Sequence, residues 1–172
     1  MTFLDFLLSI WSAIWPGRVV RTGQQGVVFR RGVAEETPRG PGLVWIIPNF
    51  WQFEARPVTL SWIDLPPQSI TTADGKVIAL SANVGYEVRD LVRALTLTND
   101  YETTMARLAT GHLHGRVSAW TLQEMMAQRR ELEASVLNTL RNRAAEWGLA
   151  VQDVRLTDCT PTKVYRLFNE EN

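Results

Sequence analysis

The residue types best suited to chemistry in this sequence are two histidines and one cysteine. His112 and His114 stand two positions apart in "GHLHG", and they are the only histidines of the chain. A zinc site needs about four ligands, and side chains two positions apart on a helix point away from each other. We therefore expect one packed and one exposed imidazole, and no metal site.

The sequence also lacks the patterns of covalent catalysis. A cysteine nucleophile needs a base and an orienting group, and no pattern identifies either of them for Cys159. There is no G-x-S-x-G elbow, no P-loop and no dinucleotide fingerprint, and "GQQG" and "PRGPG" are turn sequences. We expect no enzyme activity and no cofactor, with Cys159 partly buried near a strand end.

The composition excludes further classes of function. Eighteen basic residues balance eighteen acidic ones, so the broad positive field needed for non-specific nucleic-acid binding is missing. With 172 residues, 45% of them hydrophobic and 21% charged, the chain has the composition of one globular domain with a core. A binding or structural role is left.

The opening stretch "MTFLDFLLSIWSAIWP" is amphipathic when it is placed on a helix. Thr2, Asp5, Ser9 and Ser12 fall in one narrow polar arc. Large apolar side chains fill most of the remaining surface: Phe3, Leu4, Phe6, Leu7, Leu8, Ile10, Trp11, Ile14 and Trp15. Such a helix is about 21 Å long, which is short of a hydrocarbon core of about 30 Å.

Three interpretations of this stretch remain open. A cleaved signal peptide would need a basic start and a small-residue cleavage site, and the stretch has neither. A helix that is apolar nearly all round can also be buried in a protein core. The third interpretation, which we favour, is a monotopic anchor in one leaflet. Arg18 and Arg21 follow at once, which predicts a position on the cytoplasmic face of the cell membrane.

A second aromatic cluster lies in "PNFWQF", after a strand that is stopped by proline. Phe50, Trp51 and Phe53 either pack in the core or form a second membrane contact. In the second interpretation Phe50 and Trp51 enter the headgroup region, and Arg39 and Arg56 meet lipid phosphates.

Strand patterns occupy the part of the chain that follows the opening stretch. "RVVRTGQQGVVFRRG" predicts two short strands joined through Gly23 to Gly26, and a third strand is expected over residues 43–47. Asp74-Gly75 predicts a hairpin turn. The long strand after this turn alternates, with one apolar face made of Ile78, Leu80, Ala82, Val84, Tyr86 and Val88.

Helical patterns follow these strands, and one more strand ends the pattern. Asn99 or Asp100 can cap a helix that carries Met105, Leu108, His112 and Val117 at helical spacing. Thr121 and Glu124 make a capping box, and a longer helix is expected over residues 129–147, before the strand "LAVQDVRLTDCTP". The order predicts an α+β fold, an antiparallel sheet covered on one side by helices.

The longer helix carries mixed charges. In "MAQRRELEASVLNTLRNR" these charges form a solvated face, or they pair with a neighbouring copy of the chain. The pairing alternative joins arginines 129, 130, 141 and 143 to glutamates 131 and 133.

Five stretches in order resemble the SPFH domain of the stomatin, prohibitin and flotillin family. They are "GQQGVVFRRG", "PGLVWIIP", "LPPQSITTADGKVIALSANVGYEVRD", "LATGHLHGRVSAWTLQEM" and "EWGLAVQDVRLTDCTP". The resemblance runs from Arg18 to Phe168. It implies a non-enzymatic membrane scaffold, held on one face of a bilayer, that assembles into large homo-oligomers and organises lipid microdomains. The runner-up is a binding module that modulates a membrane protease or co-assembles with a longer SPFH relative.

The resemblance also implies a division of the chain. We expect an anchor over residues 1–16, an SPFH-like domain over 17–168 and a short tail over 169–172. The domain divides into a small β-rich part (17–65) and an α+β part (66–168). Family members usually continue into a long helix rich in alanine and glutamate, whereas this sequence reads "TKVYRLFNEEN". We therefore expect at most the first turns of a coiled-coil wall.

Overall fold

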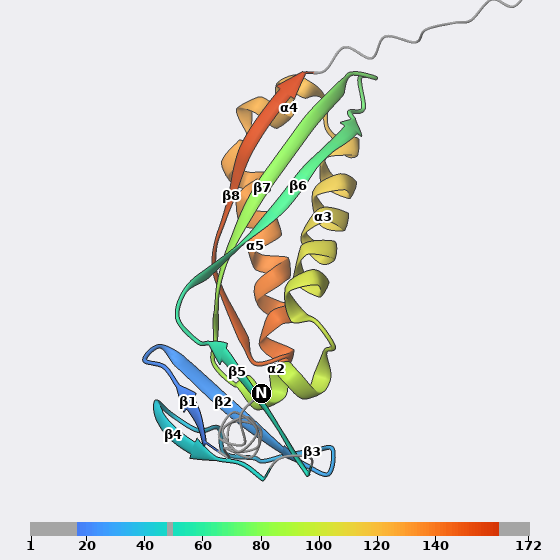
Figure 1. The fold of residues 1–172 in the computed structure, drawn as a ribbon. Coiled ribbons are helices and arrows are strands. Elements are labelled where there is room, and N and C mark those ends of the chain that lie inside the picture. The colour runs from blue at the N-terminus through green and yellow to red at the C-terminus, as the bar shows by residue number, and fades with distance from the viewer. Residues whose placement is uncertain (1–16, 48–49, 162–172) are drawn as a thin grey trace, which may run out of the picture.

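The structure, a computed structural model, describes residues 17–47 and 50–161, which form an elongated molecule (Figure 1). A small β-rich end carries the first strands of the chain. A longer body of one sheet and its helices extends away from that end. The predicted anchor helix lies outside the described residues, and so does the segment 162–172. Within the described part of the chain, no helix is both long enough and apolar enough to span a membrane.

The body is built on a three-stranded antiparallel sheet. Its order is β6 (Ser61–Thr71), β7 (Val77–Val88) and β8 (Leu149–Pro161), with β7 in the centre. The predicted turn at Asp74-Gly75 joins β6 to β7, and Gly75 has the positive φ of 74° that such a turn requires. All six residues of the predicted apolar face of β7 are buried.

Two long helices cover one face of this sheet (Figure 1). They are α3 (Tyr101–Ala119) and α5 (Arg129–Glu146), and each buries a stripe with a spacing of four residues. On α3 the stripe is Tyr101, Met105, Ala109, Leu113 and Val117. Leu108 and His112, which the sequence grouped with Met105 and Val117, are half-buried at its edge. On α5 the buried stripe is Leu132, Val136, Leu140 and Ala144.

The helix boundaries follow local signals. Asp100 caps α3, and its carboxylate accepts from the backbone N–H groups of Glu102 and Thr103 at 3.1 Å each. The predicted capping box of Thr121 and Glu124 opens α4 (Leu122–Ala127). A further short helix, α2 (Leu91–Leu97), was not predicted, because its seven residues are too few to show a helical period.

The β-rich end contains two small antiparallel sheets. The first has the order β3 (Val33–Ala34), β2 (Gln24–Arg30) and β5 (Trp51–Pro57). The second is a ribbon of β1 (Gly17–Val20) and β4 (Gly42–Trp45). β1 pairs with β4, although β2 follows it in sequence. The strand expected over 43–47 corresponds to β4, which begins one residue earlier, at Gly42, and ends two residues earlier, at Trp45. These sheets and the helix-covered sheet of the body confirm the α+β fold.

Candidate membrane contact surface

The β1–β4 ribbon turns an apolar face outward. Val19 lies directly opposite Leu43, and Gly17 lies opposite Trp45. Opposed residues, and residues two apart on one strand, share a face of a sheet. Val19, Leu43 and Trp45 therefore lie on one face, and their exposed fractions are 69%, 52% and 59%.

The opposite face of the ribbon points into the protein. Val20 is 2% exposed, and Val44 is half-buried. Ile46, just past the end of the ribbon, is also buried. In a soluble antiparallel ribbon the outer face is normally polar. Here the outer face is apolar, while the inner face carries Val20 and Val44 together with the exposed Arg18, so the outer face has the composition of a contact surface.

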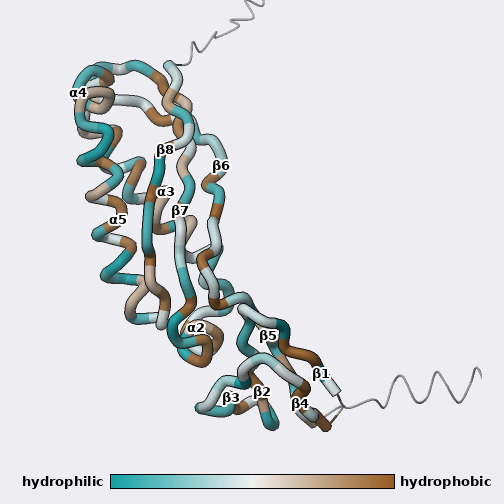
Figure 2. The backbone as a smooth tube through the Cα atoms, turned by 90° about the vertical axis from the view of Figure 1, so that its left-hand side faces the viewer, coloured by the Kyte–Doolittle hydropathy of each residue, from teal (hydrophilic) through white to brown (hydrophobic). Residues whose placement is uncertain are grey.

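Two further exposed apolar residues follow β4 in the chain. Ile47 is 51% exposed and Phe50 is 65% exposed. The backbone N–H of Phe50 donates to the carbonyl of Ile47 at 3.4 Å, which holds the two residues close together. We call Val19, Leu43, Trp45, Ile47 and Phe50 the apolar strip. It holds half of the large exposed hydrophobic side chains of the described residues, and Figure 2 shows β1 and β4 at the end of the molecule opposite α4.

Phe50 and Trp51, predicted to contact lipid together, have different environments. Phe50 is exposed, as a contact residue would be. Trp51 is half-buried, and the guanidinium of Arg30 lies 4.3 Å from its ring centroid. Phe53 of the same cluster packs on Gly26, where an added Cβ would lie 2.3 Å from the Phe53 ring. Lipid contact by Phe50 and Trp51 stays a prediction.

A charged groove of about 360 Å³ borders the strip. Glu35 lines it and pairs with Arg30 at 2.5 Å and with Arg39 at 2.9 Å. Leu43, Trp45 and Trp51 also line it. Residues 17–57 carry six arginines against three glutamates, whereas the whole chain is neutral. The β-rich end is therefore the positively charged end of the described molecule.

Elsewhere, the two histidines and the cysteine are in environments that do not suit catalysis or metal binding. His112 is half-buried, with its Nε2 3.1 Å from Ser135 Oγ, and His114 is exposed, which confirms the predicted difference between the two imidazoles. Ser135 Oγ also accepts from Arg116 Nη2 at 3.0 Å. Burial raises the pKa of the Cys159 thiol, which disfavours a thiolate. Within the described ranges, no three His, Cys, Asp or Glu side chains are grouped as a metal ion would require.

One ionisable contact joins the sheet of the body to α3. The Tyr86 hydroxyl donates to Glu102 Oε1 at 2.5 Å, and the Tyr101 ring meets the Tyr86 ring edge-on at 6.0 Å between centroids. Burial first, and the bond to Glu102 second, raise the pKa of Tyr86 far above its usual value. The phenol stays protonated and acts as a hydrogen-bond donor at this junction.

The sequence located only part of this surface. The nine apolar residues predicted to form the anchor, from Phe3 to Trp15, lie outside the described residues. Of the strip, only Phe50 was singled out. Val19, Leu43, Trp45 and Ile47 were missed, because a four-residue strand does not show which of its faces is exposed. The available signal was the crowding of four tryptophans into the first 51 residues.

The sequence is similar to known proteins over most of its length. The profile of the family described as "SPFH domain / Band 7 family" matches residues 18–167. An uncharacterized protein of Archaeoglobus fulgidus is 32% identical over 155 residues, which is 88% of this chain and 59% of that protein. Human Stomatin-like protein 3 is 28% identical over 92% of this chain and 54% of its own length. Mouse Stomatin is 25% identical over 98% of this chain and 59% of its own length. The chain thus spans a little over half the length of these relatives.

Proposed function

Because the chain belongs to the SPFH domain / Band 7 family, we propose that it is a non-enzymatic peripheral membrane scaffold that oligomerises on one leaflet and organises membrane microdomains. Stomatin-like relatives support a membrane-associated, scaffold-type role in general. The observation that carries the proposal for this chain is the apolar strip, on the β-rich end. That end carries Gly17, the residue that follows the predicted anchor.

Binding energetics support a joint contact by the anchor and the strip. Fully burying one large apolar side chain contributes about 1.5–3 kcal/mol, so partial burial of the strip adds several such increments to those of the anchor. Each arginine near an anionic surface adds about 1 kcal/mol. Arg18 and Arg21 lie in or beside β1 and are exposed, so apolar insertion and charge attraction act at the same end.

We propose that the described body faces the aqueous side and supports lateral assembly. Confinement to a surface raises the effective concentration of neighbouring copies, so weak lateral contacts suffice for a stable oligomer. Each copy would be placed on the cytoplasmic face, with residues 1–16 as anchor, 17–65 as the membrane-proximal part and 66–168 as the outer part.

A second candidate function has its own supporting observation. β6 forms one edge of the sheet of the body and pairs with no further strand among the described residues, whereas side chains of α5 bond to the backbone of β8 at the other edge. An open edge can accept a strand from another protein. This favours a binding module that modulates a membrane protease or co-assembles with a longer SPFH relative.

Liposome flotation separates the two functions. The full chain is compared with a version that lacks residues 1–16, and the oligomer size on the vesicles is measured by crosslinking. The scaffold proposal predicts that the full chain floats on protein-free vesicles and crosslinks into oligomers, and that the shortened chain floats less. If the full chain stays folded but does not float, the scaffold proposal is wrong. If it floats as a monomer until a protein partner is added, the binding module is the better description.

A further inference from the structure

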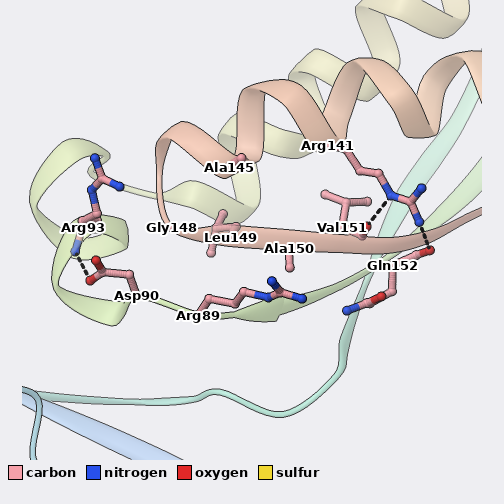
Figure 3. A pocket seen from close by; sticks show the side chains of 10 residues that line it. All are labelled: Arg89, Asp90, Arg93, Arg141, Ala145, Gly148, Leu149, Ala150, Val151 and Gln152. Carbon is pink, nitrogen blue, oxygen red and sulfur yellow. Dashed lines mark hydrogen bonds between the residues drawn. The ribbon is translucent and has the colours of Figure 1, made fainter.

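An open pocket of about 530 Å³ lies where the end of β7, α2 and the start of β8 meet (Figure 3). Three arginines line it: Arg89 after β7, Arg93 on α2 and Arg141 on α5. We call it the three-arginine pocket. It is formed by the body of the molecule, and the residues of the apolar strip do not line it.

The backbone of the pocket is held by a close contact between Gly148 and the residues that follow β7. The N–H groups of Arg89 and Asp90 both donate to the carbonyl of Gly148 at 2.9 Å. A Cβ on Gly148 would lie only 2.6 Å from the Asp90 carbonyl oxygen, so a glycine is required here. This contact brings Arg89, which follows β7, and Arg93 on α2 beside the first residues of β8.

Arg141 is a fixed cation whose charge is not cancelled by its partners. Its Nε donates to the carbonyl of Val151 at 3.0 Å, and its Nη2 donates to the carbonyl of Gln152 at 3.1 Å. Both partners are neutral. A guanidinium has five N–H donors, so three remain for a ligand. Figure 3 shows Arg141 reaching from α5 to the β8 backbone.

Arg89 and Arg93 also form no ion pair with an acidic side chain of the described residues. Five arginines in the described part of the chain form ion pairs with carboxylates: Arg30, Arg39, Arg56, Arg129 and Arg155. The three pocket arginines are not among them. Two carboxylates are close by, one of them Asp90 in the pocket lining, and neither forms an ion pair with a pocket arginine among the described residues. Asp90 accepts from the backbone N–H of Arg93 at 3.0 Å, and Glu87 accepts from the Gln152 side chain at 3.2 Å.

We infer that the three-arginine pocket binds a phosphate group, carried by a lipid headgroup or by a soluble compound. Guanidinium groups bind phosphate through paired N–H···O bonds. A phosphate presents three or more oxygens, so it can engage more than one arginine, whereas a single carboxylate has two. A bound dianion would also offset the positive charge that these three arginines give to the pocket. This inference does not depend on the proposed scaffold function, because the apolar strip takes no part in it.

Thermal unfolding of the full chain in detergent tests the inference, with inorganic phosphate as the probe. Phosphate should raise the melting temperature more than chloride does at matched ionic strength, since a ligand of the native state stabilises it. Arg89→Gln combined with Arg93→Gln should weaken the apparent phosphate affinity about tenfold or more. Arg107→Gln, an exposed arginine on α3 outside the pocket, is the matched control and should respond as the unmodified chain does. Equal effects of phosphate and chloride, or a double variant with unchanged phosphate affinity, would overturn the inference.

A second measurement needs no variant. Phenylglyoxal modifies accessible arginines, and phosphate should slow the labelling of Arg89 and Arg93 but not that of Arg107. Equal labelling with and without phosphate would contradict the site.

Vesicles of phosphatidylcholine with and without phosphatidic acid then show whether the bound phosphate belongs to a lipid or to a soluble compound. Stronger binding to phosphatidic acid that is lost in the double variant indicates a lipid phosphate, and equal binding by both proteins indicates a soluble one.

Discussion

Val19 lies directly opposite Leu43 across the β1–β4 ladder, and both side chains point away from the core. Their neighbours Val20 and Val44 point inward. The ribbon therefore places apolar surface on both sides of a structure only two strands wide. An isolated two-stranded ribbon is marginally stable in water. Covering its outer face would stabilise the ribbon as well as attach the protein, so folding of this end and membrane contact are expected to be linked.

Replacing two side chains of the strip should weaken membrane binding. Leu43→Ser combined with Trp45→Ser removes apolar surface that is more than half exposed, so the fold should be retained. Losing partial burial of two large side chains in lipid should weaken vesicle binding about tenfold or more. Flotation with a concentration series measures it.

Met126→Ser is the matched control for this experiment. Met126 is 55% exposed and lies on α4, at the other end of the molecule. Its replacement should leave vesicle binding unchanged. If Met126→Ser reduces binding as much as the strip variant does, the membrane does not select the β-rich end.

We expect Phe50 to contact the membrane and Trp51 to stabilise the fold. Phe50→Ser should weaken vesicle binding with little change in stability, because Phe50 is 65% exposed. Trp51→Ser should lower the free energy of unfolding by about 1–2 kcal/mol, because it removes a half-buried ring and the contact with Arg30. Urea unfolding and flotation are measured on both variants. Two variants that lose binding equally, with unchanged stability, would contradict this division.

The long elements were predictable because their signals are local. The alternation of β7 and the capping box at Thr121 are each encoded within a few residues. The pairing of β1 with β4 joins segments more than twenty residues apart, and this pairing decides that Val19 and Trp45 share an outer face. The three-arginine pocket was missed for the same reason. Arg89, Arg93 and Arg141 line one pocket only because α5 packs beside β8. The sequence showed Arg141 only as part of a charged helix.

Gly148 should tolerate no side chain. Its φ is 77°, and an added Cβ would lie 2.6 Å from the Asp90 carbonyl oxygen. Gly148→Ala should therefore destabilise the protein by about 2 kcal/mol or more, as measured by urea unfolding. Gly111→Ala is the opposite control. Gly111 lies inside α3, with open space at its Cβ position, so alanine should stabilise by about 0.5–1 kcal/mol. Similar losses in both variants would show that the close contact at Gly148 is not the cause.

Asp74 should make stability depend on pH in the acid range. The Thr72 hydroxyl first, and Lys76 second, lower the pKa of Asp74 from 3.8 to about 2 in the folded chain. A carboxyl group whose pKa is lower in the folded state than in the unfolded state stabilises the fold at pH values above its unfolded-state pKa. This contribution is lost as the pH falls through its folded-state pKa. Asp74→Asn should therefore be less stable than the unmodified protein above pH 3.8, and the difference should shrink between 3.8 and about 2.

Thr72→Val tests the cause of this shift. Without the hydroxyl donor the pKa of Asp74 should rise toward 3.8, so the contribution of Asp74 should disappear at a higher pH than in the unmodified chain. Free energies of unfolding from urea titrations at several pH values give both difference curves. A difference between the unmodified and Asp74→Asn proteins that stays constant from pH 5 to pH 2 would mean that the carboxylate charge contributes nothing at this turn. The role of Asp74 would then be limited to the geometry of the hairpin between β6 and β7.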